Sequence, residues 1–391
     1  MITAECAVER ARSLRPRLQE RAAHCEAIRR CPDESIADLY DTGLMQIMQP
    51  ARYGGSELGL DAAADVSLEL AAACPSTAWV WLNLATHSWN IAQFGRQAQD
   101  DVWNGDARAV AATGTAFPCG KARAVEGGYR VSGRWPFGSG VDSAGWMLIG
   151  ANVEREGGPP ERRLMLVPRP DFRSLDNWHA YGLTGSGSHD VVIDDAFVPE
   201  HRTVAPELVV SGTGAPGAAI SDSPVYRIPM FAGFGFALAS VPLGAARAAV
   251  QEFVSGLRKR VGTFTAARLS EMAPMQMRVA EITACVDFAL TTYRADLAEL
   301  TRLTVAGATI DDDTKVRWKR NQAFAMTLCK RAVDSVMAAS GAGGLSTSQS
   351  FQRYFRDINA GAAHIGLTWD VQAPVYGRQA LGLPMDRGIL V

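Results

Sequence analysis

Residues 121–140, KARAVEGGYRVSGRWPFGSG, contain the pattern that decides the fold. Apolar and polar residues alternate on either side of Gly127 and Gly128, and this alternation predicts two strands joined by a tight turn. Short apolar runs bounded by Gly, Pro and Asp predict further strands; they are AGWMLIGANV (144–153), RRLMLVPR (162–169) and HDVVIDDAFVP (189–199). We therefore expect residues 111–205 to form a middle β-domain, a small sandwich or barrel.

Helical patterns flank this β segment on both sides. Residues 1–110 repeat apolar side chains at helical spacing, which predicts an N-terminal helical domain. Residues 206–228 are rich in Gly, Ser, Ala and Pro and are expected to form a long exposed linker loop. Residues 229–391 contain four long helical patterns with short connections, which are typical of a four-helix bundle. The predicted fold class is therefore α+β and mainly α.

The last helical pattern carries a polar stripe. RYFRDINAGAAHIGLTWD (353–370) reads as helix, and at 100° per residue Arg353, Asp357 and His364 fall on one face. Arg353 is one turn before Asp357, and these two side chains are expected to pair. His364 is nearly two turns beyond Asp357, about 10 Å along the axis, which is too far for a direct hydrogen bond.

The bulk composition excludes several classes of protein. With 391 residues, 47% apolar side chains and a net charge of −2, the chain is typical of a folded protein without a nucleic-acid partner. No apolar run approaches the roughly 20 residues that span a bilayer, and no membrane partner is expected. The seven cysteines include no CxxC pair and the six histidines no HxxxH pair, which predicts reduced thiols, a cytoplasmic location and no metal site.

Three motifs follow one another along the chain: GGYRVSGRWPFGSGVDSAGW (127–146), WHAYGLTGSGSHDVVIDDAFVP (178–199) and RYFRDINAGAAH (353–364). With the order of segments, they resemble the acyl-CoA dehydrogenase fold, and within it the reduced-flavin-dependent monooxygenases, the oxygenase halves of two-component systems. The resemblance implies a homotetramer that uses FADH2 or FMNH2 and O2, through a C4a-hydroperoxyflavin, to oxygenate a small aromatic substrate, above all by hydroxylation. Since the chain has no GxGxxG signature, a separate NAD(P)H:flavin reductase is expected.

Three alternatives stay open at this stage. Acyl-CoA dehydrogenases remove an α-proton with a glutamate near the end of the last helix, but the residues after Asp357 read INAGAAHIGL and contain no Glu. This departure argues against a dehydrogenase that acts on acyl-CoA thioesters. Oxygenation at nitrogen or sulfur is the second alternative within the same fold, and a non-enzymatic scaffold is the third.

The resemblance also assigns the reacting groups. It implies that the Ser139 hydroxyl faces flavin N5, with Trp135 and Phe137 close to the flavin ring. It places His364 beside the substrate, where an imidazole acts as a base toward a phenol hydroxyl or orients another kind of substrate.

A second histidine, His87, matches a pocket histidine that comes from the N-terminal domain. The competing interpretation is a core histidine whose ring is satisfied by Asn83 or Asn90, and the two readings are equally supported. The aromatic residues around it could line an apolar pocket; they are Trp79, Trp81, Trp89 and Phe94.

Further positions are implied to bind the cofactor. Arg227 lies where the hydroxylases place an arginine against the flavin pyrimidine, and Arg260, with Arg258 and Lys259 as competitors, fits an arginine that reaches flavin phosphate across a subunit interface. Gly343 and Gly344 belong to SGAGGLS (340–346), which matches a glycine-rich turn before the last helix, and amides at a helix N-terminus bind phosphate.

Overall fold

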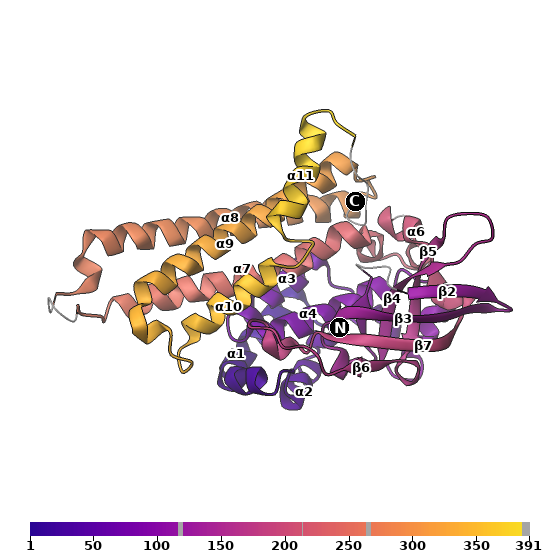
Figure 1. Ribbon diagram of the computed structural model, residues 1–391, viewed down its shortest axis with the longest axis horizontal. Helices are drawn as coiled ribbons and strands as arrows, with labels where there is room; N and C mark the ends of the chain where they lie inside the picture. Colours follow the sequence, from indigo (N-terminus) through magenta and orange to yellow (C-terminus); the bar gives the residue numbers. More distant parts are fainter. Residues whose placement is uncertain (116–119, 213, 263–266, 385–391) are drawn as a thin grey trace.

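The computed structural model describes residues 1–115, 120–212, 214–262 and 267–384. Helices come first, then a sheet, then a second group of helices, and this order and the mainly helical fold class confirm the prediction (Figure 1). The N-terminal helices are α1 (Ala4–Ala27), α2 (Asp33–Asp41), α3 (Leu60–Ala71), α4 (Pro75–Ile91) and α5 (Arg96–Trp103).

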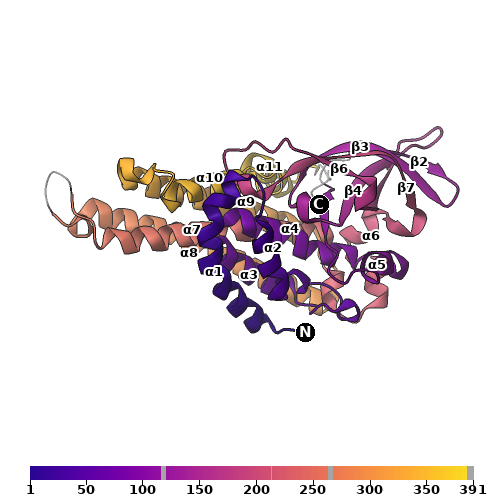
Figure 2. The same cartoon turned by 90° about the horizontal axis from the view of Figure 1, so that it is seen from below.

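Helix α4 is the centre of the N-terminal segment. Every one of its residues is buried, as expected for a helix that is apolar nearly all round. Pro75 occupies its first turn, where the missing N–H of proline costs nothing. Helix α4 contacts both strand β1 (Ala111–Gly114) and the long helix α7 (Met230–Leu257), while α3 packs along α7, and the N-terminal helices thereby join the sheet to the bundle (Figure 2).

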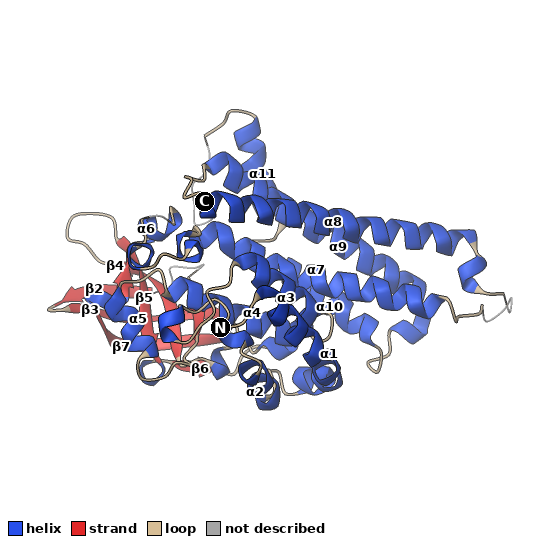
Figure 3. Ribbon diagram, turned by 180° about the vertical axis from the view of Figure 1, so that it is seen from behind, coloured by secondary structure: helices blue, strands red, loops and turns tan. Residues whose placement is uncertain are grey.

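The middle segment is one continuous mixed sheet, which occupies one end of the molecule (Figure 3). Its strands are β1 (Ala111–Gly114), β2 (Gly120–Val125), β3 (Gly128–Gly138), β4 (Trp146–Val153), β5 (Glu161–Pro168), β6 (Arg173–Leu175), β7 (His189–Pro199) and β8 (Thr203–Val204). The predicted hairpin is β2–β3, and Gly127 turns it with a φ of 77°. The strand order is β6-β7-β3-β2-β4-β5-β8, with β1 paired in parallel to β4.

The C-terminal segment contains three long helices, α7 (Met230–Leu257), α8 (Ala273–Val305) and α9 (Asp312–Gly344), followed by the shorter α10 (Ser350–Ala362) and α11 (Trp369–Ala380) (Figure 1). The prediction that residues 353–370 form one helix is wrong. Helix α10 ends at Ala362, and the Thr368 hydroxyl donates to the carbonyls of Ala363 and His364, which a longer helix would have used. Gly366 in the same turn has poor helix propensity.

Helix α7 is the core helix of the bundle. Among the described residues it is the one helix whose length and apolar composition would suit a membrane span, and 83% of its most apolar stretch is buried inside the fold. It packs against α3, α4, α8, α9 and α10, and this contact pattern accounts for its composition.

The segment after the sheet does not form the long exposed loop that its composition predicts. Residues Pro206–Val210 form the short helix α6, and 3₁₀ turns follow at Pro216–Ile220 and Pro224–Arg227. Val209 and Tyr226 are fully buried, and Gly217 packs so closely on Ala92 that a Cβ atom there would lie 1.7 Å from the Ala92 carbonyl oxygen. The abundance of glycine in this segment predicted a loop. Gly217 shows another use of glycine, which is to permit close packing on the N-terminal domain.

Candidate active site

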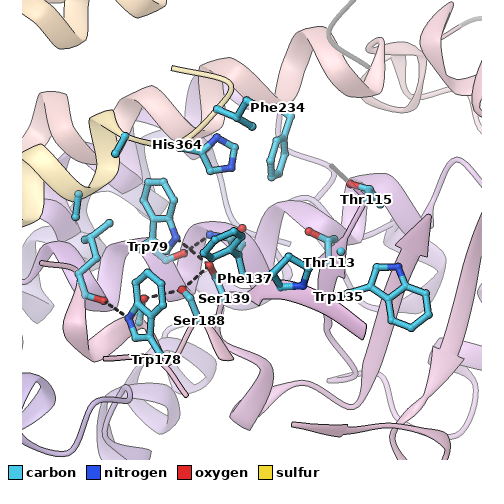
Figure 4. A pocket seen from close by; sticks show the side chains of 18 residues that line it. Trp79, Thr113, Thr115, Trp135, Phe137, Ser139, Trp178, Ser188, Phe234 and His364 are labelled. Carbon is cyan, nitrogen blue, oxygen red and sulfur yellow. Dashed lines mark hydrogen bonds between the residues drawn. The ribbon is translucent and has the colours of Figure 1, made fainter. Parts of the chain in front are cut away.

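A cavity of about 380 Å³ lies between the sheet and the helices (Figure 4). One wall consists of strands β1 and β3 and the loop 177–188, and the other of helices α4, α7 and α10 with the turn after α10. The described residues that line it are Trp79, Asn83, Thr113, Gly114, Thr115, Trp135, Pro136, Phe137, Ser139, Trp178, Leu183, Ser186, Ser188, Phe234, Ala360, Ala363, His364 and Ile365. A cavity of this size is in the range that holds small organic ligands.

Ser139 lies in this cavity, directly after strand β3, where a bulge disturbs the pairing with β7. Phe137 in the bulge has a φ of 64°, an uncommon conformation for a non-glycine residue and one that clusters at functional sites. The Ser139 hydroxyl accepts a hydrogen bond from Trp79 Nε1 at 3.0 Å and shares another with Ser188 Oγ at 2.8 Å. Ser188 Oγ lies 2.7 Å from Ser186 Oγ, and the three hydroxyls form a chain along the cavity wall (Figure 4).

Trp135 and Phe137 belong to the same wall but differ in environment. The Trp135 ring is fully buried, and its Nε1 donates to the Gly150 carbonyl at 2.9 Å. Gly120 leaves room for this ring, because a Cβ atom there would lie 2.1 Å from it. Phe137 is 56% exposed and meets Trp178 edge-on, with ring centroids 6.2 Å apart. Trp135 is therefore the enclosed part of this wall, and Phe137 lies at its solvent-exposed edge.

His364 also lines the cavity, but it lies in the turn after α10 and not on the helix. Its ring centroid is 6.1 Å from that of Trp79 and 6.4 Å from that of Phe234 (Figure 4). Burial lowers its pKa to about 4, and the ring is therefore neutral at neutral pH. Because Nδ1 accepts a hydrogen bond from the backbone N–H of Gly366 at 3.1 Å, the single ring proton is on Nε2.

His87 lies behind the cavity wall. Its Nδ1 donates to the Ala111 carbonyl at 2.8 Å, and its Nε2 accepts from the Thr113 hydroxyl at 3.4 Å. The ring stacks on Phe234 with centroids 5.7 Å apart. Burial lowers its pKa to about 4, against the smaller raising effect of the Ala111 carbonyl. The partners are not the predicted asparagines, because Asn83 Nδ2 donates to a carbonyl of its own helix.

Asp357 does not pair with Arg353, contrary to the prediction. Arg353 reaches Glu26 of helix α1, with Nε 3.3 Å from the carboxylate, while Asp357 is turned inward and is 4% exposed. Asp357 Oδ1 accepts a hydrogen bond from the backbone N–H of Leu183 at 2.6 Å. Burial raises the Asp357 pKa to about 7, although the Leu183 hydrogen bond acts in the opposite direction.

This bond fastens the loop 177–188 to helix α10. Leu183 has a φ of 48°, and its carbonyl accepts from Trp178 Nε1 at 3.0 Å (Figure 4). Gly182 lies so close to α10 that a Cβ atom there would be 2.1 Å from the Arg356 carbonyl oxygen. Helix α10 therefore sets the position of two residues, Trp178 and Leu183, that line the cavity.

Arg227 does not line the cavity; it ends the 3₁₀ turn Pro224–Arg227, just before helix α7. Among the described residues its guanidinium makes no hydrogen bond or ion pair.

Arg260, Gly343 and Gly344 lie together at the far end of the bundle. Arg260 donates to the carbonyls of Ala339 at 3.4 Å and Ser340 at 3.3 Å. Gly341, with a φ of 62° and a ψ of −166°, interrupts helix α9 there. Helix α10 begins only at Ser350, and Gly343 and Gly344 are therefore not at its N-terminus as predicted.

This end of the bundle is distant from the cavity of the same chain. Phe234, near the start of helix α7, lines the cavity, and Leu257 ends the helix. At 1.5 Å per residue these two residues are about 35 Å apart. Residues near Arg260 therefore cannot contact a small molecule that occupies the cavity of their own chain.

Several lining residues have no individual signal in the sequence. Of the aromatic residues around His87, only Trp79 lines the cavity, whereas Trp81, Trp89 and Phe94 are fully buried elsewhere. Asn83 lies one turn after Trp79 on α4, a regularity that could have identified it. Ser188 belongs to the GLTGSGSHD motif, but its contact with Ser139 joins residues 49 positions apart in the chain.

The described lining contains no Asp or Glu side chain. Abstraction of an α-proton from an acyl thioester needs a base at the reacting carbon, and a carboxylate is what the dehydrogenases would place there. The argument against a dehydrogenase, made from one segment of the sequence, thus extends to the whole described wall of the cavity.

Comparison with protein families gives two matches. Residues 8–106 match the acyl-CoA dehydrogenase N-terminal domain, and residues 236–369 match the acyl-CoA dehydrogenase C-terminal domain. The two matched ranges contain helices α4 and α10 and most of helix α7, which lie on one side of the cavity.

Individual relatives are similar over nearly the whole chain. The chain is 33% identical over 379 residues to the flavin-dependent monooxygenase, oxygenase subunit HsaA, of Rhodococcus jostii, covering 97% of this chain and 99% of that protein. It is 34% identical over 371 residues to the FADH2-dependent resorcinol hydroxylase, oxygenase component, of Rhizobium sp., covering 93% and 90%. The crystal structure of XiaF from Streptomyces sp. in complex with FADH2 and glycerol superposes with a TM-score of 0.91 at 29% identity, covering 98% and 96%.

Proposed function

The chain belongs to the oxygenase components of the flavin-dependent monooxygenases, which have acyl-CoA dehydrogenase domains, and we propose that its cavity binds reduced flavin beside a small aromatic compound and oxygenates that compound. The observation that supports this most directly is the Ser139 hydroxyl, which lies in an aromatic cavity whose described lining contains no carboxylate. Hydroxylation at carbon is favoured over nitrogen or sulfur oxygenation, because the relatives above 30% identity include hydroxylases.

The residues of the β wall fit a flat ring with polar edges. Trp135 and Phe137 provide apolar surface, and Thr113, Thr115 and Ser139 provide hydroxyl groups at its border. Bound reduced flavin supplies the activation of molecular oxygen, while the protein supplies orientation and electrostatics. FADH2 is favoured over FMNH2, because a relative is named for FADH2 and a similar structure contains it.

Ser139 is proposed to hold the reactive edge of the flavin ring. Because Trp79 donates to the Ser139 oxygen, that hydroxyl can direct its own proton to the cofactor or to Ser188. Trp79 and Ser188 therefore fix where the hydroxyl points. His364 completes the opposite wall and faces the space left for the aromatic compound, and His87 supports that wall through Phe234.

Three residues that the resemblance assigns to the cofactor lie far outside the cavity of their own chain. We propose that Arg260, Gly343 and Gly344 contact the flavin phosphate of a neighbouring copy, which requires an oligomer and accords with a homotetramer. Arg227 is available for the flavin pyrimidine, because its guanidinium has no partner among the described residues. The word "component" in the relatives' names supports a separate reductase, and the free thiols of all six described cysteines accord with a cytoplasmic location.

Rapid mixing tests the function. The protein is mixed anaerobically with dithionite-reduced FAD and then with oxygen, and flavin reoxidation and hydrogen peroxide release are followed with and without a phenol. We expect reoxidation slower than that of free FADH2 and a hydroxylated product. Reoxidation at the rate of free flavin without product would overturn the proposal, and bleaching of oxidised FAD by an acyl-CoA would indicate a dehydrogenase.

A further inference from the structure

Trp178 and Phe137 form the solvent-facing border of the cavity. Both side chains line the cavity, and Trp178 is half-buried while Phe137 is 56% exposed. Their ring centroids are 6.2 Å apart and the ring planes meet at 89°, an edge-to-face arrangement that is favourable for aromatic rings (Figure 4). The position of the Trp178 backbone therefore decides how well this border of the cavity is closed.

His189 holds the Trp178 backbone from outside the cavity. It is the first residue of strand β7, it is 6% exposed, and it is not among the described lining residues. Its Nδ1 accepts hydrogen bonds from the backbone N–H groups of Asn177 at 3.3 Å and Trp178 at 3.2 Å. A ring nitrogen that accepts carries no proton, and the ring proton is therefore on Nε2.

The two amides depend on His189 to different degrees. The Asn177 N–H also donates to the Leu175 carbonyl at 2.8 Å. The Trp178 N–H, in contrast, has His189 Nδ1 as its one acceptor in the described part of the chain. Loss of the imidazole would therefore leave the Trp178 amide without a partner, and this loss has a free-energy cost.

Asp142 favours the tautomer that holds Trp178. It belongs to the turn Val141–Ser143, shortly after Ser139, and its Oδ2 lies 3.6 Å from His189 Nε2. This distance is too long for a direct hydrogen bond, but the carboxylate attracts the Nε2–H group and so favours a ring whose Nδ1 is free to accept. The segment that contains Ser139 is thereby linked through His189 to the backbone of Trp178.

Arg29 holds the other end of the same residue. Its guanidinium donates to the Trp178 carbonyl at 3.2 Å and pairs with Asp176 at 2.7 Å. The Asp176 carboxylate is also 4.0 Å from His189 Nδ1, but it is directed to Arg29. The amide of Trp178 is thus held by His189, and its carbonyl by Arg29.

We propose that His189 is a positioning residue for the proposed oxygenation, which holds Trp178 against Phe137 so that the two rings keep bulk water out of the cavity. The inference rests on the proposed function and adds to it a histidine outside the cavity. In coupled turnover reduced flavin supplies two electrons, one oxygen atom enters the aromatic compound and the other leaves as water. In uncoupled turnover the same two electrons and two protons reduce O2 to hydrogen peroxide. A closed cavity suppresses this second outcome, because water exclusion prevents side reactions.

Hydrogen exchange tests the contact in the protein without any cofactor. Deuterium uptake of the Trp178 amide is followed by mass spectrometry in wild type, His189→Leu and His189→Asn. The Asn side-chain oxygen can occupy the position of Nδ1 and accept, whereas Leu offers no acceptor. We expect exchange roughly five- to tenfold faster in His189→Leu, the value of one hydrogen bond, and close to the wild-type rate in His189→Asn. Exchange at the wild-type rate in His189→Leu would overturn the proposal.

His201→Leu is the matched control. His201 follows the other end of strand β7, its Nε2 lies 2.6 Å from Asp101, and neither of these two residues lines the cavity. The variant removes a histidine contact in the same domain and should leave the exchange of the Trp178 amide unchanged. Equal acceleration in His201→Leu and His189→Leu would indicate a general loss of stability and would count against positioning by His189.

Turnover tests whether the contact matters for the reaction. The ratio of hydrogen peroxide to hydroxylated product is measured with reduced FAD, oxygen and a phenol. We expect the ratio to rise by roughly five- to tenfold in His189→Leu and to stay near the wild-type value in His189→Asn and His201→Leu. Trp178→Ala should raise the ratio as well, and His189→Leu should add little in that background, because the two residues act through one contact. A full further rise in the double variant would show that His189 does not act through Trp178.

The two proposals fail in distinguishable ways. If wild type forms product but His189→Leu keeps the wild-type ratio, the positioning role is wrong while the oxygenase function stands. If wild type forms no hydroxylated product, the oxygenase function is wrong and this inference with it. Should His189→Leu not fold, His189→Gln replaces it in both experiments. Its amide reaches the Nε2 position and leaves the Trp178 N–H without an acceptor, and the same changes are expected.

Discussion

The indole Nε1 of Trp79 donates a hydrogen bond to the hydroxyl of Ser139 across 3.0 Å, and this contact joins helix α4 to the end of strand β3. The two residues come from opposite walls of the cavity. Since the donor on the helical wall occupies one lone pair of the oxygen, the direction of the Ser139 O–H is restricted before any ligand enters. The cavity is thus preorganised by a bond between helix α4 and the end of strand β3.

Ser139→Ala removes the hydroxyl from the proposed flavin site. We expect the ratio of hydrogen peroxide to hydroxylated product to rise by roughly five- to tenfold, the value of one hydrogen bond. The ratio is measured in turnover with reduced FAD, oxygen and a phenol. Ser174→Ala on strand β6, away from the described lining, is the control. A wild-type ratio in Ser139→Ala would rule out the proposed role.

Asp357 positions the wall that contains Leu183 and Trp178. Asp357→Ala leaves the Leu183 N–H without its acceptor, and we expect a stability loss of about 1–3 kcal/mol and more peroxide per product. Asp357→Asn keeps an acceptor oxygen and should restore most of the coupling between oxygen use and product. If Asn and Ala at this position behave alike in turnover, the hydrogen bond to Leu183 has no positioning role.

Asp357 also gives the stability a pH dependence of known sign. Its pKa is about 7 in the folded protein against 3.8 for an ordinary aspartate. The contribution of this carboxyl to the free energy of unfolding is therefore fully present below about pH 4 and is lost as the pH rises through 7. Asp357→Asn removes this loss. Its unfolding free energy relative to wild type should improve between pH 4 and 8, by at most roughly 4 kcal/mol, in urea denaturation. A constant difference would show that the carboxyl titrates normally.

His87 makes the free energy of unfolding depend on pH in the opposite direction. Its pKa is about 4 in the folded protein against 6.5 in an unfolded chain, and its contribution is fully present above pH 6.5 and is lost as the pH falls toward 4. In wild type this loss reaches roughly 3 kcal/mol. His87→Phe should be less stable at pH 7.5, but the deficit should shrink as the pH approaches 4.5. Urea unfolding at a series of pH values measures it, and a deficit that grows on acidification would contradict the burial of a neutral ring.

Gly182→Ala tests the fit between the loop and helix α10. The added methyl would meet the Arg356 carbonyl at 2.1 Å, and the loop must shift. We expect a destabilisation of about 1–3 kcal/mol, the usual cost of overpacking, together with weaker binding of the aromatic compound. Gly145→Ala has no heavy atom within 4 Å of the added methyl and serves as the control. Equal melting temperatures and ligand affinities for the two variants would contradict the tight contact.

Ser139 was assigned to the site by the resemblance of the consecutive residues around it, and it does line the cavity. Local alternation predicts the strand Gly128–Gly138 that ends directly before Ser139, but not the role of its hydroxyl. The cavity around it could not be predicted in detail. Trp79 and Ser188, which fix the hydroxyl, lie 60 and 49 residues away in the chain.

Asp357 shows the limit of local spacing. Helical spacing places Arg353 one turn before Asp357 on the same face, yet each side chain pairs with another part of the fold. Arg353 pairs with Glu26, and Asp357 accepts from the Leu183 amide, 174 residues away. The predicted position of His364 on the helix was wrong for a similar reason. The helical periodicity of the sequence continues as far as His364. The helix nevertheless ends at Ala362, because the chain turns at Gly366 and the Thr368 hydroxyl donates to the His364 carbonyl.

The distance of about 35 Å along α7 between Phe234 and Leu257 has a consequence for how the protein responds to dilution. If one copy surrounds the flavin ring and another contacts its phosphate, as proposed, cofactor affinity depends on protein concentration through mass action. A dilute sample would release flavin without any damage to either wall of the cavity. Cofactor retention and subunit association would then be one linked equilibrium, in which reduced flavin holds the copies together.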